Sequence, residues 1–185
     1  MNVKKPLRPL CFGLACLGML ASCATQSPPH PVEPRAASAH AAAPPVAHTA
    51  TPLETVALIH GGAGPWVVAG YRMGTFALGK LGVPRGSFDL EVTHHTPKQV
   101  QYTCVADGAA AATGASLGKL NLALAEAESA NVRTTYRRKS TGQSVTLRPA
   151  AAFVARYKDV PREKLADAGR EVMDLPEDQV FEVVP

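Results

Sequence analysis

The chain has 185 residues, a length that is expected for one folded domain. Its 19 Lys and Arg residues and 15 Asp and Glu residues give a formal net charge of +4. Three of these cations, Lys4, Lys5 and Arg8, lie in an N-terminal stretch without acids, and the 16 that remain nearly balance the 15 acidic residues. The charge therefore does not indicate a nucleic-acid-binding protein, which needs a basic patch on its folded domain.

The N-terminal segment has the features of an export signal. A positively charged start is followed by an apolar run from Leu10 to Ala21, which is too short to span a bilayer as a helix. The run ends in Leu20-Ala21-Ser22-Cys23, which resembles a bacterial lipobox. We therefore expect residues 1–22 to be a lipoprotein signal peptide and Cys23 to carry the lipid anchor. An ordinary signal peptide ending near a cysteine is the alternative. Because residue 24 is not Asp, the resemblance implies the outer membrane, with the protein facing the periplasm.

The segment from 23 to 53 is rich in Pro and Ala and has no aromatic residue. Such a composition cannot bury enough apolar surface to fold, so we expect a disordered tether before a core domain over 54–185. Cys11 and Cys16 would leave with the signal peptide and Cys23 would be acylated. Cys104 is then the one cysteine of the mature domain, which excludes an internal disulfide.

Hydrophobic periodicity and turn signals predict a mixture of helices and strands after residue 54. Gly82 is a suitable stop for the first helix, and Gly70 and Gly74 within it indicate close contact with another backbone. Helices are predicted over 66–81, 104–112, 149–157 and 161–174, and extended segments over 87–94, 99–102, 120–126, 132–139, 144–148 and 179–184. Without a regular alternation of strand and helix, the pattern indicates an α+β fold, an antiparallel sheet packed with helices in a single core domain.

Two blocks of residues resemble a known family. The sequence Cys104-Val105-Ala106-Asp107-Gly108, followed by Thr113-Gly114 and by Leu117-Gly118-Lys119-Leu120-Asn121-Leu122, is similar to the signature of the formylmethanofuran dehydrogenase E-type family. His60-Gly61 with Gly64-Pro65 resembles the entry to that family's opening helix. The likeness covers about 55–185 and implies an α+β core domain that is often dimeric. A Cys-rich zinc module found in some members is not expected, since no cysteine follows Cys104.

The signature residues are candidates for one ligand site. Gly and Ala let a backbone approach a ligand closely, and a few polar groups then orient it. Cys104 and Asp107 share a helix face. We expect the candidates to converge on one cavity with His60 at its rim: His60, Cys104, Asp107, Thr113, Ser116, Lys119 and Asn121. The Gly-rich turn after His60 could also bind an anion at the start of the next helix, although Pro65 removes one donor.

Four interpretations of these residues stay open. His60 and Cys104 could hold a transition metal such as zinc, although structural zinc takes about four protein ligands. Cys104 could be the nucleophile of a thiol-dependent enzyme with His60 as its base. The cavity could bind a small ligand without chemistry, or the small residues could serve packing alone, in a structural envelope protein that acts through dimer contacts. The favoured hypothesis is a non-catalytic, lipid-anchored domain that binds a small ligand or a metal ion, forms a homodimer and does not bind nucleic acid.

Overall fold

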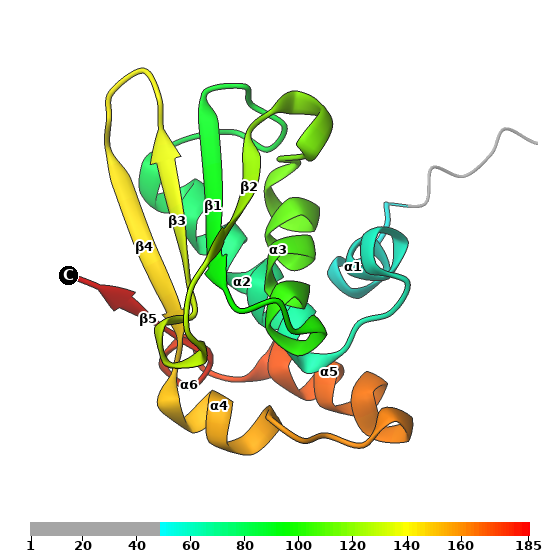
Figure 1. Ribbon diagram of the computed structural model, residues 1–185. Coiled ribbons are helices and arrows are strands. Elements are labelled where there is room, and N and C mark those ends of the chain that lie inside the picture. Colours follow the sequence, from blue (N-terminus) through cyan, green and yellow to red (C-terminus); the bar gives the residue numbers. More distant parts are fainter. Residues whose placement is uncertain (1–48) are drawn as a thin grey trace, which may run out of the picture. The chain divides into compact units, whose positions relative to one another are not determined.

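The computed structural model describes residues 49–185, so the predicted signal peptide, the lipid site at Cys23 and most of the predicted tether lie outside the described residues. A five-stranded sheet with strand order β2-β1-β3-β4-β5 forms the centre of the fold (Figure 1). The α-helices are α1 (Pro52–His60), α2 (Pro65–Leu81), α3 (Val100–Thr113), α4 (Ala151–Tyr157), α5 (Leu165–Asp174) and α6 (Glu177–Val180). The strands are β1 (Leu90–Thr96), β2 (Leu122–Glu126), β3 (Arg133–Arg138), β4 (Ser144–Pro149) and β5 (Phe181–Val184). Between 49 and 185, no helix is long and apolar enough to cross a membrane.

The predicted α+β class is confirmed, with a sheet that is mixed. Strands β1, β3, β4 and β5 pair antiparallel along the sheet, as the hairpin signal around Gly142 predicts for β3 and β4. Strand β2 is parallel to β1, with Thr93 opposite Ala123. Because α3 links β1 to β2, the chain has enough residues to return to the same end of the sheet before β2 begins.

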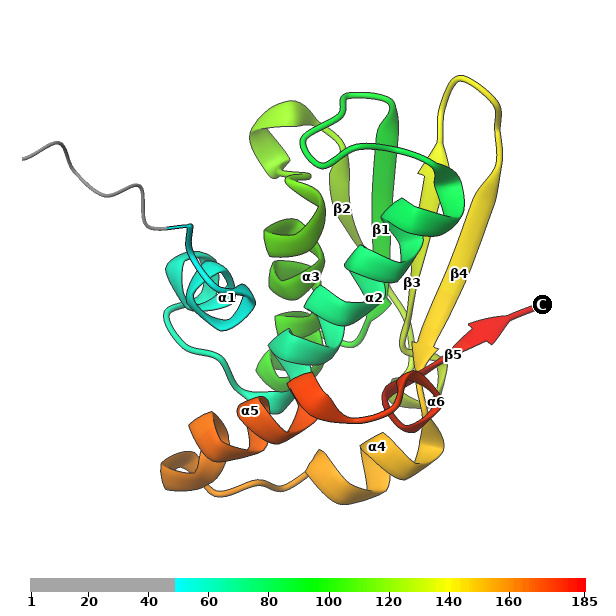
Figure 2. The same cartoon turned by 180° about the vertical axis from the view of Figure 1, so that it is seen from behind.

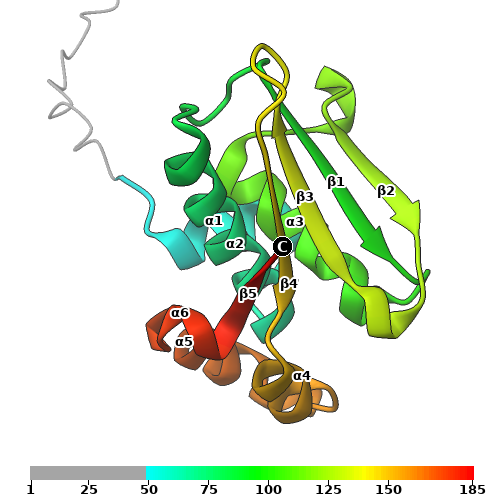
Figure 3. The ribbon, with the colours of Figure 1, turned by 90° about the vertical axis from the view of Figure 1, so that its left-hand side faces the viewer.

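Helices α2 and α3 pack against each other on one side of the sheet (Figures 2 and 3). Their backbones touch at glycines. A Cβ atom at Gly70 would lie 2.2 Å from the carbonyl oxygen of Val105, and one at Gly108 would lie 1.9 Å from that of Val67. The predicted close contact at Gly70 is therefore confirmed, and Gly108 serves the same contact from α3.

Several predicted element boundaries differ from the structure. The prediction of an extended segment over 99–102 is wrong, because α3 begins at Val100 and the amides of Tyr102 and Thr103 both donate to the carbonyl of Gln99. No side chain caps this helix start, so the sequence carries no start signal there. Strand β2 begins two residues later than predicted, because Leu120 adopts a left-handed conformation with φ 53°.

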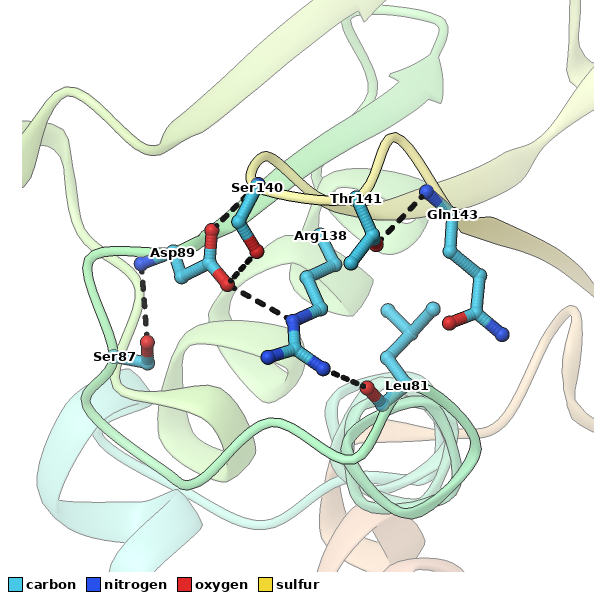
Figure 4. Close-up of polar contacts among 7 residues, drawn as sticks. All are labelled: Leu81, Ser87, Asp89, Arg138, Ser140, Thr141 and Gln143. Carbon is cyan, nitrogen blue, oxygen red and sulfur yellow. Dashed lines mark hydrogen bonds and ion pairs between the residues drawn. The ribbon is translucent and has the colours of Figure 1, made fainter.

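The β3–β4 hairpin is fastened to the start of β1 through Asp89 (Figure 4). The Asp89 carboxylate accepts hydrogen bonds from the amide of Ser140 at 2.8 Å, from its hydroxyl at 2.7 Å and from Nε of Arg138 at 3.0 Å. The hydrogen bonds from Ser140, with a smaller contribution from Arg138, lower the pKa of Asp89. Arg138 also reaches the carbonyl of Leu81, so one small network joins the end of α2, the start of β1 and the hairpin.

Candidate functional site

The residues His60 and Asp107 meet although 47 positions separate them in the chain. Nδ1 of His60 lies 2.8 Å from Oδ2 of Asp107. Helix α1, which ends at His60, starts with a capping box formed by Thr51 and Glu54 and ends at Gly61, whose φ is 84°. The left-handed Gly61 stops the helix and turns the chain toward α2. The His60–Asp107 contact thus fixes the end of α1 on the face of α3.

A cavity of about 550 Å³ lies beside this contact, and we call it the α2–α3 groove. It is bounded by the end of α1, the turn before α2, the first turns of α2 and α3, and the start of α5. Its lining is mostly apolar. The lining residues are His60, Gly61, Gly62, Ala63, Gly64, Pro65, Trp66, Val67, Val100, Gln101, Cys104, Val160, Arg162, Leu165 and Ala166.

Close packing holds the walls of the groove in place. A Cβ atom at Gly169 of α5 would lie 1.7 Å from the carbonyl oxygen of Ala63, so α5 packs directly on the Gly-rich turn. Trp66 is 5% exposed, and its Nε1 donates to the carbonyl of Tyr157 at 2.8 Å. The Trp66 ring also makes edge-to-face contacts with Tyr102 and Phe153. These contacts make the groove a preformed site rather than a gap between loops.

Cys104 lines the groove as a protonated thiol. Its Sγ donates to the carbonyl of Val100 at 2.9 Å, one helical turn earlier. Burial, and then the negative charge of Asp107, raise the pKa of Cys104. Within 49–185, no hydrogen bond joins Cys104 to His60, whose Nδ1 is taken by Asp107. The arrangement therefore disfavours the thiolate that a nucleophilic cysteine needs.

The donor atoms of the groove do not fit a zinc site built by this chain. In the part of the chain that the structure describes, no three His, Cys, Asp or Glu side chains cluster closely enough to hold a metal ion. His60 and Cys104 are the two candidate ligands in the lining, and structural zinc takes about four. We derive no chemistry through a metal from these residues.

The other predicted site residues lie at the opposite end of α3. Cys104 and Thr113 are about 13 Å apart along the helix axis, at 1.5 Å per residue. None of the four residues concerned lines the groove, and they form a second cluster: Thr113, Ser116, Lys119 and Asn121. The expected single cavity is thus divided between a groove with His60 and Cys104, beside Asp107, and this separate cluster.

The hydrogen bonds of the second cluster shape the turn from α3 into β2. Nζ of Lys119 donates to the carbonyls of Gly114 at 2.9 Å and Gly86 at 3.2 Å. The side-chain amide of Asn121, a residue that is 2% exposed, accepts from the backbone of Ser116 and donates to the carbonyl of Leu90. These polar groups are occupied by backbone partners, so their contacts are those of a scaffold for the crossover.

Thr113 completes the same turn. Its hydroxyl donates to the carbonyl of Ala109 at 2.7 Å and accepts from the amide of Ala115 at 3.1 Å. Gly114 follows with φ 70°, and a Cβ atom there would lie 3.0 Å from Cα of Gly86. The glycine and small residues of this stretch therefore let the chain reverse tightly against the loop before β1.

Sequence reasoning missed two groove residues, Trp66 and Arg162. Trp66 follows the Gly-rich turn and Pro65, a pattern that marks a helix start and could have placed it in the site. Arg162 comes from a segment almost a hundred residues further on. No local pattern links it to the turn, because the packing of α5 against Ala63 brings it there.

Comparison with known proteins places the groove and the crossover in one family domain. The family model described as "FmdE, Molybdenum formylmethanofuran dehydrogenase operon" matches residues 59–182. The matched range includes both the groove wall at His60 and the crossover at Lys119. No curated protein matches the chain.

Proposed function

The chain belongs to the FmdE family, and we propose that its domain binds a small, largely apolar molecule in the α2–α3 groove without transforming it. One observation carries this proposal. His60 and Cys104, which the sequence singles out, line a cavity of about 550 Å³, and ligand pockets in proteins have volumes of about 300–1,000 Å³. The mostly apolar lining with a few polar groups is the usual composition of such sites.

The state of Cys104 favours binding over catalysis. A catalytic cysteine needs a lowered pKa and a base within hydrogen-bonding reach. Here burial and Asp107 raise the pKa of the thiol, and Val100 accepts its hydrogen bond. A thiol-dependent enzyme would have to reverse both features. A metal ion at His60 and Cys104 would need further ligands from outside residues 49–185.

We also propose that the protein is a lipoprotein anchored through Cys23 and facing the periplasm from the outer membrane. The support is the charged N-terminus, the short apolar run and the sequence Leu20-Ala21-Ser22-Cys23. Lipid on one cysteine would hold the ligand-binding domain at a membrane surface. Mass spectrometry of the mature N-terminus tests this part independently of the groove.

A homodimer through the edge of β2 is the third part of the proposal. The amide of Val92 donates to the carbonyl of Asn121, and the amide of Ala127 donates to that of Thr96. In a parallel pair with this register, the odd-numbered residues of β2 bond to β1. The backbone N–H and C=O groups of the even-numbered residues therefore face away from β1, where they are free to pair with another strand.

The side chains along this edge suit a second copy of the chain. Leu124 is 57% exposed and Leu120 is 91% exposed, although exposed edge strands usually carry charges that block pairing. The strand runs from a basic end at Lys119 to an acidic end at Glu126 and Glu128. A two-fold axis at Leu124 would pair the two strands antiparallel and bring the acidic end of one near the basic end of the other.

The ligand-binding proposal is tested by blocking the groove. Ala166 lies at its wall on the exposed side of α5, so Ala166→Phe should fill the cavity without disturbing the core. Ala155→Phe on the exposed face of α4 is the matched control. A small-molecule collection would be screened by the fluorescence of Trp66, the chain's single tryptophan. Compounds that bind the parent and the control but not Ala166→Phe would support the proposal, and compounds that bind all three equally would contradict it.

A further inference from the structure

The charged groups of the α2–α3 groove are all of one sign. Of its lining residues, Arg162 and His60 can carry a positive charge, and none is Asp or Glu. Arg162 forms no ion pair with any residue between 49 and 185. The acidic neighbours of the lining in the chain, Asp159 and Glu163, do not line the groove, and Asp107 is engaged by His60.

Unpaired backbone donors add to this positive character. Helices α2 and α3 both begin at the groove, and neither has a side-chain cap or an acidic residue in its first turn. The amides of Trp66 and Val67 in α2, and of Val100 and Gln101 in α3, have no hydrogen-bond partner among the described residues. The N-terminal ends of helices carry partial positive charge and favour anions.

The rest of the lining is apolar. Trp66, Val160 and Leu165 come from three different segments and border the same cavity as the positive groups. A small inorganic anion would leave this surface exposed to water, whereas an apolar body would cover it. The groove thus combines a cationic part with an apolar part in a volume that exceeds the needs of an inorganic ion.

We infer that the α2–α3 groove selects small organic oxyanions, either carboxylates or phosphate esters, that carry an apolar chain or ring. Arg162, His60 and the free amides hold the charged head, and Trp66, Val160 and Leu165 cover the apolar body. This inference rests on the proposed ligand-binding function and names the class of its ligand. The charge on the ligand, and not its apolar surface alone, then decides the affinity.

The test compares three probes of equal chain length on the full chain, with Trp66 fluorescence as the readout. The probes are octanoate, octyl phosphate and the neutral octan-1-ol. We expect at least one of the two anions to bind about tenfold more tightly than the alcohol, because hydrogen bonds to charged groups are the stronger ones. The tighter anion identifies the head group as a carboxylate or a phosphate.

A pair of variants locates the charge recognition. Arg162→Gln should weaken binding of the preferred anion about tenfold and leave binding of octan-1-ol unchanged. Lys164→Gln is the matched control, because it removes the same charge from the same turn at a residue outside the lining. Equal effects of the two variants would overturn the inference, since the attraction would then be a general field.

The other outcomes separate the inference from the proposal on which it rests. If octan-1-ol binds as tightly as both anions, the groove is an apolar site, so the inference fails while the proposed function stands. If none of the three probes binds, the result contradicts both.

Discussion

The imidazole of His60 lies 2.8 Å from the carboxylate of Asp107 and joins the end of α1 to the middle of α3. The side chains are 25% and 49% exposed, so water screens the pair and limits its contribution to stability. Asp107 also lies one helical turn from Cys104, and its charge raises the pKa of that thiol after the larger effect of burial. One carboxylate therefore positions a groove residue and suppresses the reactivity of its neighbour.

Replacing Asp107 should separate these two effects. Asp107→Asn keeps a hydrogen-bonding group beside His60 but removes the charge, so the pKa of Cys104 should fall and its alkylation by iodoacetamide below that pKa should become faster. Asp107→Ala should also lower the free energy of unfolding, by about 1 kcal/mol, since the contact with His60 is lost. Peptide mapping by mass spectrometry would follow Cys104 alone. Asp167→Asn, a change in an exposed acid of α5, is the control, and an unchanged alkylation rate in Asp107→Asn would contradict the assignment.

The α2–α3 contact should be intolerant of a single methyl group. Gly108→Ala would place a Cβ atom 1.9 Å from the carbonyl oxygen of Val67, so the two helices would have to separate. We expect a loss of about 3 kcal/mol or more in unfolding free energy, or failure to fold. Gly79→Ala is the matched control, since nothing lies within 4 Å of a Cβ atom there. It should stabilise α2 by about 0.5–1 kcal/mol in urea denaturation. Similar stability of the two variants would contradict the close packing.

The buried His94 makes folding sensitive to mild acid. Its Nε2 donates to the carbonyl of Tyr102 and its Nδ1 accepts from the hydroxyl of Thr134, so the neutral ring is fully hydrogen-bonded. Burial is the main cause that lowers the pKa of His94 from 6.5 to about 4. In the unfolded chain the ring takes up a proton near pH 6.5, whereas in the folded chain it does so only near pH 4. Stability is therefore complete above about pH 6.5 and is lost as the pH falls toward 4, by about 3 kcal/mol in total.

Urea denaturation between pH 7.5 and pH 4 would measure this loss. His94→Gln should be less stable at neutral pH but should lose less stability on acidification, since the titrating group is gone. His95→Gln, at the adjacent position on the more exposed face of β1, should retain the pH dependence. An equal pH dependence in the parent and in His94→Gln would show that other groups cause it.

The sequence predicted those features that depend on local pattern. The apolar period over 66–81 and Gly82 placed α2, and the turn at Gly142 placed the hairpin. The start of α3 was missed because Gln99 gives no capping signal and the segment is held by the burial of Tyr102. The site was predicted only in part for a related reason. Signature residues that are close in sequence lie at opposite ends of one helix, whereas Arg162 reaches the groove through the packing of Gly169 on Ala63.

The second cluster could not have been distinguished from a ligand site by composition. Lys119 and Asn121 have the chemistry of ligand-binding residues, and their small neighbours suit a close approach. What separates the two interpretations is that the carbonyls of Gly86, Gly114 and Leu90 already occupy their donors. The glycines provide close approach in both cases, but here the approaching group is the protein's own backbone.

Substitution at the two edges of the sheet tests the dimer. Leu124 of β2 and Val183 of β5 are both exposed apolar residues of edge strands, at 57% and 55%. Leu124→Lys would place a charge at the proposed two-fold axis, where two like charges would meet, so we expect the dimer to dissociate. Val183→Lys makes the same change at the opposite edge and should leave the dimer intact. Sedimentation velocity at several concentrations of the full chain would measure the mass. A parent chain that is monomeric at all concentrations would contradict the homodimer, and dissociation by Val183→Lys alone would place its interface at β5.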